Sequence, residues 1–352
     1  MRVAFFGSSL VSAYWNGAAT YYRGLIRALH GLGHEVTFFE PDAYERQAHR
    51  DLDDPSWARV VVYRPEAWAD ALEFARGHDV VVKASGVGIN DRELEAGVLE
   101  VGAPTTVFWD VDAPATLARL EADADDPLRA LLPRYDLVLT YGGGDPVVAR
   151  YRSLGARECV PVYNALDPDT HFPVAPDPRF DASVAFLGNR LPDREGRVDE
   201  FFFAATRHAP ELSFLLGGAG WEDRPLPRNV RYVGHVPTSE HNAFNSSPLA
   251  VLNVSRESMA ANGWSPATRV FEAAGAGACV VTDAWNGIEL FLEPGGEILV
   301  AESGEEVGQL VSALTPEAAR GVGQRARRRV LQEHTYSRRA RQVEQVLLGV
   351  PA

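Results

Sequence analysis

Residues 262–279 combine a predicted helix start with an arginine and a glutamate on one face of that helix. Ser265 is a favourable N-cap residue and Pro266 a favourable first helical residue, so we expect the helix to begin there. Its unpaired N–H groups would favour an anion. Arg269 could reach a phosphate while Glu272, three positions later, accepts hydrogen bonds from two ribose hydroxyls. The alternative is an ordinary ion pair between the two, which stabilises a helix by only about 0.2–0.5 kcal/mol.

A glycine and several arginines follow another predicted strand, over residues 186–197. The glycine would let the backbone approach a diphosphate, and guanidinium groups would neutralise its charge. We therefore assign four residues to the binding of a nucleoside diphosphate: Gly188, Asn189, Arg190 and Arg194. Among them Arg190 is favoured because it lies nearest the strand end. The alternative is a surface loop whose arginines pair with acidic residues of the same loop.

Two further loops are assigned to the binding of the same nucleotide. Gly234, His235 and Val236 close a predicted strand, and their turn could present N–H and C=O groups to a nucleobase edge. A lone histidine is more often structural than catalytic, so His235 also has a structural interpretation. Gly17 precedes a predicted helix, where a glycine lets a ligand approach the free N–H groups or serves the turn alone. The G-x-G-x-x-G fingerprint is absent, which argues against a dinucleotide dehydrogenase.

Asp110 and Asp112 follow a predicted strand and are the candidate catalytic residues. A carboxylate in that place could act as a general base toward an acceptor hydroxyl. The D-x-D pattern also occurs in metal-dependent sugar transferases, but three-residue patterns arise by chance, and we predict no metal site. Asp112 could instead cap the helix that follows.

Short apolar runs alternate with helical patterns along the whole chain, which is typical of parallel sheets covered on both faces. The predicted fold class is α/β, with two Rossmann-like lobes facing across a cleft. Ligands of such folds bind at the carboxyl ends of the strands. The predicted strands are 3–6, 36–39, 60–63, 80–83, 105–109, 137–140, 158–162, 184–187, 212–216, 230–233, 250–254, 279–282 and 298–300.

The composition limits the class of partner. The chain has 352 residues, enough for about two domains, and is 46% hydrophobic. Its 34 basic and 48 acidic residues give a net charge of −14, which argues against nucleic acid as a partner. Two cysteines are too few for a disulfide framework or a zinc site. We see no signal peptide and no integral membrane segment, so we expect a cytoplasmic protein, whose oligomeric state the sequence does not indicate.

Three segments carry a resemblance to a known family: 265–272, 276–283 and 291–299. Across residues 183–335 the sequence resembles glycosyltransferases of the GT-B fold, most closely their CgeB-like, spore-maturation branch. The resemblance implies an acceptor-binding domain over 1–166 and a nucleotide-sugar-binding domain over 183–335. The proline-rich stretch 167–182 would link them, and the helix 336–352 would return to the first domain.

The resemblance also assigns roles. It implies that Glu272 binds the ribose of a nucleoside-diphosphate sugar and that neither a metal nor a further cofactor is needed. Many relatives carry an acidic residue eight positions earlier, where this chain has Trp264, so the stereochemical outcome stays open.

We therefore expect a glycosyltransferase that moves a sugar from a nucleoside-diphosphate sugar to a small-molecule, glycan or peptide acceptor. One alternative is a nucleotide-sugar 2-epimerase of the same fold, which would need no acceptor. The other is a two-lobed sugar-binding protein without catalysis. A neutral sugar needs no phosphate site, so the arginine and glutamate of the predicted helix argue against the second alternative.

Overall fold

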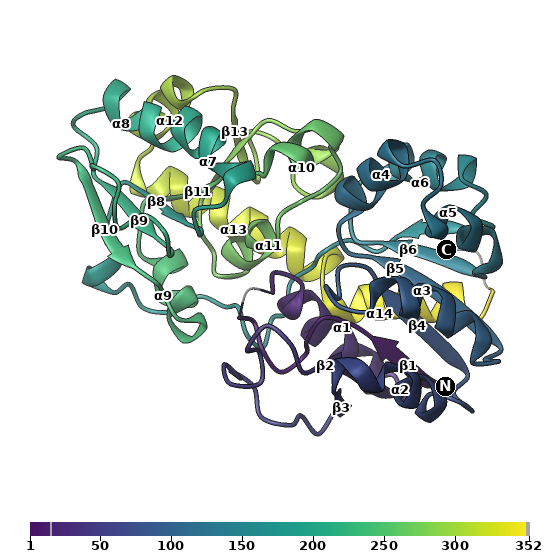
Figure 1. Ribbon diagram of the computed structural model, residues 1–352. Coiled ribbons are helices and arrows are strands. Elements are labelled where there is room, and N and C mark those ends of the chain that lie inside the picture. The colour runs from purple at the N-terminus through teal and green to yellow at the C-terminus, as the bar shows by residue number, and fades with distance from the viewer. Residues whose placement is uncertain (15, 350–352) are drawn as a thin grey trace. The chain divides into compact units, whose positions relative to one another are not determined.

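The computed structural model describes residues 1–14 and 16–349. The chain divides into two compact units (Figure 1). Unit 1 comprises Met1–Asn164 and Tyr336–Ala352, and unit 2 comprises Ala165–Thr335. Unit 2 is thus inserted between two parts of unit 1. Among the described residues, no helix is long and apolar enough to cross a membrane.

Unit 1 is built on a seven-stranded parallel sheet with the order β3-β2-β1-β4-β5-β6-β7. Its central strands are buried on both faces because they are continuous apolar runs; every residue of β4 is buried. The strands are β1 (Arg2–Phe6), β2 (Glu35–Pro41), β3 (Arg59–Tyr63), β4 (Val80–Ala84), β5 (Thr105–Asp110), β6 (Leu137–Thr140) and β7 (Cys159–Pro161).

Unit 2 repeats the plan with a six-stranded parallel sheet in the order β10-β9-β8-β11-β12-β13. Its strands are β8 (Val184–Leu187), β9 (Phe214–Gly217), β10 (Val230–Gly234), β11 (Ala250–Asn253), β12 (Val280–Asp283) and β13 (Leu299–Ala301). Each strand predicted from the sequence overlaps one of these thirteen, and the predicted pair of Rossmann-like α/β lobes is confirmed.

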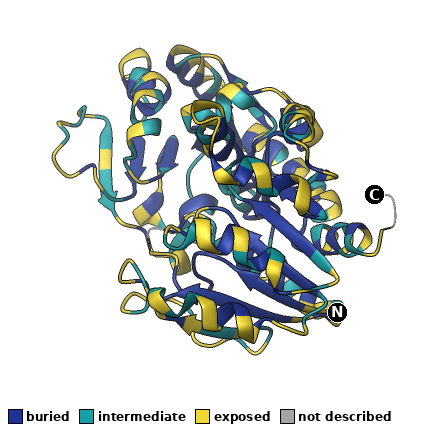
Figure 2. Ribbon diagram, turned by 45° about the vertical axis from the view of Figure 1, so that its right-hand side comes forward, coloured by how far each residue is buried: buried dark blue, intermediate teal, exposed yellow. Residues whose placement is uncertain are grey.

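Helices connect the strands and cover the sheets. Figure 2 shows strands in the colour of buried residues and the outer sides of helices in that of exposed ones. In unit 1 they are α1 (Ala19–Gly31), α2 (Trp68–Phe74), α3 (Asp91–Gly97), α4 (Ala113–Ala122), α5 (Pro127–Leu131), α6 (Gly144–Ser153) and α14 (Tyr336–Leu347). In unit 2 they are α7 (Pro192–Val198), α8 (Ala204–His208), α9 (His241–Ser246), α10 (Glu257–Asn262), α11 (Thr268–Gly275), α12 (Gly304–Ser312) and α13 (Pro316–Glu333).

Short irregular turns complete the elements. A π-helical turn, η5 (Asp199–Phe203), joins α7 to α8. The 3₁₀ turns are η1 (Pro65–Ala67), η2 (Val98–Glu100), η3 (Leu132–Arg134), η4 (Pro178–Phe180), η6 (Thr238–Glu240) and η7 (Ile288–Leu290).

The last helix belongs to unit 1. α14 packs against α1, where Gly24 leaves room for the ring of Tyr336; a Cβ at Gly24 would collide with that ring. α14 also contributes Val343 and Leu347 to an apolar lining that includes strand residues such as Phe5. The C-terminal helix is therefore part of the core of unit 1.

Residues 167–182, expected as an extended linker, form part of unit 2. Their backbone N–H groups donate to side chains at both ends of the unit's helix α9: Phe172 N to Asn242 Oδ1 at 3.2 Å near its start, and Asp177 N to Ser247 Oγ at 2.9 Å just after its end. Leu166 pairs with Thr335 in a parallel bridge. The two points where the chain leaves and re-enters unit 1 therefore lie side by side.

Candidate functional site

The start of α11 differs from the sequence prediction. The helix begins at Thr268, and its N-cap residue Ala267 is extended (φ −65°, ψ 147°) with no side-chain cap. The Ser265 hydroxyl instead donates to the Gly263 carbonyl at 2.9 Å. The prediction of a Ser265 cap with Pro266 as the first helical residue is therefore wrong. A turn at Gly263–Trp264 with positive φ at both residues uses the Ser265 hydroxyl before the helix begins.

Trp264 has a packing role that accounts for this turn. Its backbone N–H donates to the Asn286 carbonyl at 2.6 Å. Its ring covers Gly287, where a Cβ would collide with the indole. Gly287 has φ +88°, a conformation that glycine adopts without strain. The position at which many relatives carry an acidic residue is thus occupied here by a half-buried indole.

Arg269 lies on the first turn of α11 and is half-buried. Its guanidinium carbon is 5.3 Å from the centre of the Phe186 ring. In the described part of the chain it forms no ion pair or hydrogen bond, so the ion pair with Glu272 that was the alternative is not formed. Burial, followed by the charge of Arg194, lowers the pKa of Arg269 to about 10. The charge of Glu272 opposes this shift but forms no ion pair with Arg269. A half-buried cation that is not ion-paired is suited to bind an anionic ligand.

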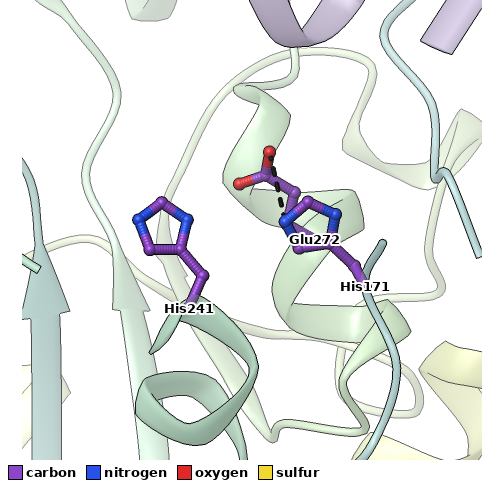
Figure 3. A group of neighbouring side chains, drawn as sticks. All are labelled: His171, His241 and Glu272. Carbon is purple, nitrogen blue, oxygen red and sulfur yellow. Dashed lines mark ion pairs between the residues drawn. The ribbon is translucent and has the colours of Figure 1, made fainter. Parts of the chain in front are cut away.

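Glu272 lies one turn later on α11, with 16% of its side chain exposed. Its Oε1 is 3.7 Å from Nε2 of His171, which is buried in the segment after β7. His241, the first residue of α9, completes a group whose nitrogen and oxygen atoms lie within 4.8 Å of one another. Figure 3 shows that the three side chains converge from separate elements.

The two histidines were not predicted, because no local spacing relates them to Glu272. Each ring has a second hydrogen-bonding partner: His171 Nδ1 is 2.9 Å from Thr170 Oγ1, and His241 Nε2 is 3.3 Å from the Val236 carbonyl. Burial lowers the pKa of His241, although the nearby Glu272 carboxylate opposes that shift.

The loop after β8 is closely packed at Gly188. A Cβ there would come within 2.9 Å of the Phe186 ring and 3.1 Å of the Arg194 guanidinium. The Gly188 carbonyl accepts a hydrogen bond from Trp221 Nε1 at 2.8 Å. Asn189 Oδ1 accepts one from Ala219 N at 3.0 Å, which fixes this loop to the loop after β9.

The loop after β9 was missed by the sequence analysis. Gly218 has φ +116°, and a Cβ on it would collide with the Gly188 carbonyl, so only glycine fits there. The signal was present as the run 217–220, which contains three glycines directly after a strand. This close approach holds two strand ends of unit 2 together.

Arg190 and Arg194 differ in their surroundings. Arg190 forms ion pairs with Glu195 at 2.6 Å and with Asp223 at 2.8 Å, so its guanidinium is committed to acidic neighbours. The alternative of an arginine paired within its own loop therefore describes Arg190. Arg194 is the one whose charge reaches Arg269.

The loop after β10 is tied to the same region. Gly234 has φ +71°, and its carbonyl accepts a hydrogen bond from Gly218 N at 2.7 Å. His235 is exposed, whereas Val236 is buried and directs its carbonyl to His241. Two of the three carbonyls that were candidates for a nucleobase edge thus have partners within unit 2.

Asp110 is fully buried at the end of β5 in unit 1. Its carboxylate accepts hydrogen bonds from Ser85 Oγ at 2.7 Å, Thr116 Oγ1 at 3.0 Å, the Asp112 N–H at 3.0 Å and the Tyr151 hydroxyl. Burial raises the pKa of Asp110. This environment is that of an internal hydrogen-bond acceptor that organises the strand end.

The other two unit 1 candidates are more accessible. Asp112 is half-buried at the N-cap position of α4, but its side chain makes no cap hydrogen bond. Gly17 is exposed two residues before α1, with open space where a Cβ would lie. Neither backbone crowding nor positive φ requires a glycine at position 17.

The chain is similar to known proteins in sequence and in structure. Residues 194–345 match a protein family described as glycosyl transferase-like. No curated protein sequence matches the chain.

Solved structures match nearly the whole chain. Anabaena HepE in complex with UDP and glucose has a TM-score of 0.68 and 14% identity, covering 99% of this chain and 100% of its own. Sucrose-phosphate synthase from Thermosynechococcus elongatus has a TM-score of 0.72 and 14% identity, covering 99% and 98%. AviGT4, a glycosyltransferase involved in avilamycin A biosynthesis, has a TM-score of 0.65 and 20% identity, covering 99% of both chains.

The similar structures identify the fold as GT-B, which confirms the predicted fold class. The match to the glycosyl transferase-like family begins within unit 2 and ends within α14.

Proposed function

We propose that the protein transfers a sugar from a nucleoside-diphosphate sugar, with the pyrophosphate bound at Arg269 and the ribose at Glu272. The observation that carries this assignment is a half-buried guanidinium that forms no ion pair with any described residue, one helical turn before the half-buried carboxylate of Glu272. The Anabaena HepE structure, which shares the fold, contains UDP and glucose. Segments 265–272 and 276–283 further support placement in the CgeB-like branch.

The chemistry follows from charge. When the glycosidic bond to the donor breaks, negative charge grows on the departing diphosphate, and a positioned cation stabilises it in the transition state. Arg269 supplies that cation, and the field of Arg194 adds to it. Because side chains provide the positive charge, we propose that catalysis requires neither a metal nor a cofactor. Glu272 fixes the nucleoside through its two carboxylate oxygens.

The acceptor is a small molecule, a glycan or a peptide bound by unit 1. If a base assists the acceptor hydroxyl, Asp112 is better suited than Asp110. Asp110 already accepts hydrogen bonds from several groups of its own unit, whereas Asp112 is half-buried at a helix start.

Isothermal titration with UDP and TDP tests the ribose assignment. Glu272→Ala should weaken UDP binding tenfold or more, because both ribose hydroxyls lose their acceptor; tenfold corresponds to about 1.4 kcal/mol. Glu289→Ala, which removes an exposed glutamate of unit 2, is the matched control and should bind as the parent does. Equal affinity in the Glu272 variant would reject the assignment.

Product analysis tests the reaction class. Incubation of a bound UDP-sugar with candidate acceptors should release UDP and form a glycoside detectable by NMR. Conversion of the donor sugar to its C2 epimer without any acceptor would instead identify an epimerase. Binding without either reaction would favour a sugar-binding protein.

A further inference from the structure

We propose that His171, His241 and Glu272 form a binding site for a divalent transition metal such as Zn²⁺. The site uses the carboxylate that we assign to the ribose, so the metal and the nucleotide compete. The metal site depends only on the described side chains, whereas the competition also rests on the proposed function.

The distances fit a small cation. The ligand atoms of the three residues lie within 4.8 Å of one another, and His171 Nε2 is 3.7 Å from Glu272 Oε1. Tetrahedral zinc with bonds of about 2.0–2.2 Å places its ligand atoms roughly 3.3–3.5 Å apart. Small rotations of side chains would therefore bring the three atoms to metal-binding separation.

Nε2 is the nitrogen of His171 that faces the group. The other nitrogen, Nδ1, lies 2.9 Å from the Thr170 hydroxyl, which also lies 3.2 Å from the Asp167 carbonyl. In the tautomer whose Nδ1–H donates to that hydroxyl oxygen, Nε2 directs a lone pair toward the Glu272 carboxylate.

The same argument applies to His241. Its Nε2 is 3.3 Å from the Val236 carbonyl, which only accepts, so Nε2 carries the proton. Figure 3 shows the other ring nitrogen, Nδ1, directed toward Glu272. Two imidazole lone pairs and a carboxylate thus converge, an arrangement that a cation between them would stabilise.

Metal-bound histidines in proteins usually donate their second ring N–H to a carbonyl or another acceptor, which orients the ring. Both histidines here have such an acceptor, Thr170 for one and Val236 for the other. Two imidazoles and one carboxylate match the ligand preference of zinc, whereas Mg²⁺ prefers oxygen ligands alone. Three protein ligands also leave the fourth position of zinc open for water. This ligand set contains no cysteine, which is why the cysteine count did not indicate it.

Titration of the full chain with Zn²⁺ in metal-free buffer tests the site. We expect one zinc per chain and no binding of Mg²⁺. His171→Ala and His241→Ala should each weaken zinc binding by about tenfold or more, because one of three ligands is lost. His208→Ala, which removes an exposed histidine on α8, is the matched control and should bind zinc as the parent does. Unfolding temperatures in chelator show whether the variants remain folded.

Absence of zinc binding in the parent would overturn the site. Equal zinc affinity in the parent and both folded histidine variants would also overturn it.

A second titration, of UDP with and without saturating zinc, tests the competition. Zinc should weaken UDP binding in the parent. In His171→Ala the ratio of the UDP affinity without zinc to that with zinc should approach one. Zinc binding with no effect on a UDP affinity that is measurable would overturn the shared use of Glu272. If UDP does not bind even in chelator, the proposed function fails, and the zinc titration still decides the metal site.

Discussion

The two units use the same architecture, but their charged candidate residues have different surroundings. In unit 1 the carboxylate of Asp110 has several donors around it, and the ammonium of Lys83 lies 2.6 Å from Asp91 Oδ1. In unit 2 the guanidinium of Arg269 forms no ion pair in the described chain, and Glu272 has two histidines nearby, His171 at 3.7 Å and His241.

This difference separates structural from ligand-binding groups. An ionised side chain taken out of water costs free energy unless hydrogen bonds or an opposite charge compensate it. Unit 1 provides the compensation internally, so removal of one partner would leave the others buried without compensation. Unit 2 leaves the compensation of Arg269 to an anion from solution. Position at a strand end alone does not distinguish the two cases, since Asp110 occupies one as well.

The largest effect is expected from Asp110→Ala. Several buried donors would lose their acceptor, so the free energy of unfolding should fall by about 2–4 kcal/mol. Urea denaturation measures the loss. Asp53→Ala, at an exposed position of the same unit, should change stability by less than about 0.5 kcal/mol. An Asp110 variant of full stability that no longer transfers sugar would show that the carboxylate is catalytic and that the comparison is wrong.

Arg269→Ala should affect the ligand and not the fold. Removal of a charge-assisted contact to the pyrophosphate should lower the affinity for UDP about 10- to 100-fold, which corresponds to about 1.4–2.7 kcal/mol. Thermal unfolding without ligand should be unchanged or shifted upward, because an uncompensated charge is removed. Arg190→Ala is the matched control: its guanidinium is already paired with two carboxylates, and we expect a change in UDP affinity of less than about threefold. Equal losses in both variants would remove the distinction between paired and unpaired arginines.

The smallest expected effect is on the free energy of unfolding at acidic pH. Burial alone would raise the pKa of Asp91, but the Lys83 ammonium and hydrogen bonds from Lys83 and the backbone lower it below the usual value. A carboxylate whose folded pKa is lowered contributes stability above its unfolded pKa of about 3.9, and this stability is lost as the pH falls through the folded value. Asp91→Asn should therefore lose less stability than the parent between pH 5 and pH 3, although it is less stable at pH 7. The difference in slope should stay below about 1.4 kcal/mol per pH unit.

Urea denaturation at pH 5, 4 and 3 measures the slopes. Asp53→Asn, at an exposed position, should keep the parental slope. Parallel slopes in the parent and Asp91→Asn would show that the pair with Lys83 does not couple folding to protons.

The strands and the fold class could be predicted from the sequence because a strand buried on both faces is a short run of mostly apolar residues, which is visible locally. The start of α11 could not, since it depends on the turn at Trp264, whose N–H and ring contact Asn286 and Gly287 on a later loop. The sequence favoured Arg190 as the arginine that binds the diphosphate. It could not show that Arg190 is ion-paired with Asp223, because Asp223 follows a different strand.

Arg269 and Glu272 were accessible to sequence reasoning because one helix carries both. His171 and His241 reach Glu272 from elements distant in the chain, so only the folded unit brings them together. What the sequence reveals of this site is therefore the part that lies within a single element.

The place of α14 sets an order for biosynthesis. A ribosome completes the seven strands of unit 1 with Pro161, but the helix that covers Phe5 and fills the space beside Gly24 is made only after unit 2. Domains generally fold as they emerge, N-terminal first. Here the strands of unit 1 expose an apolar face until unit 2 and α14 have been translated, whereas unit 2, being one uninterrupted stretch, can finish folding earlier. A chain truncated before Tyr336 would lose the first unit rather than the second.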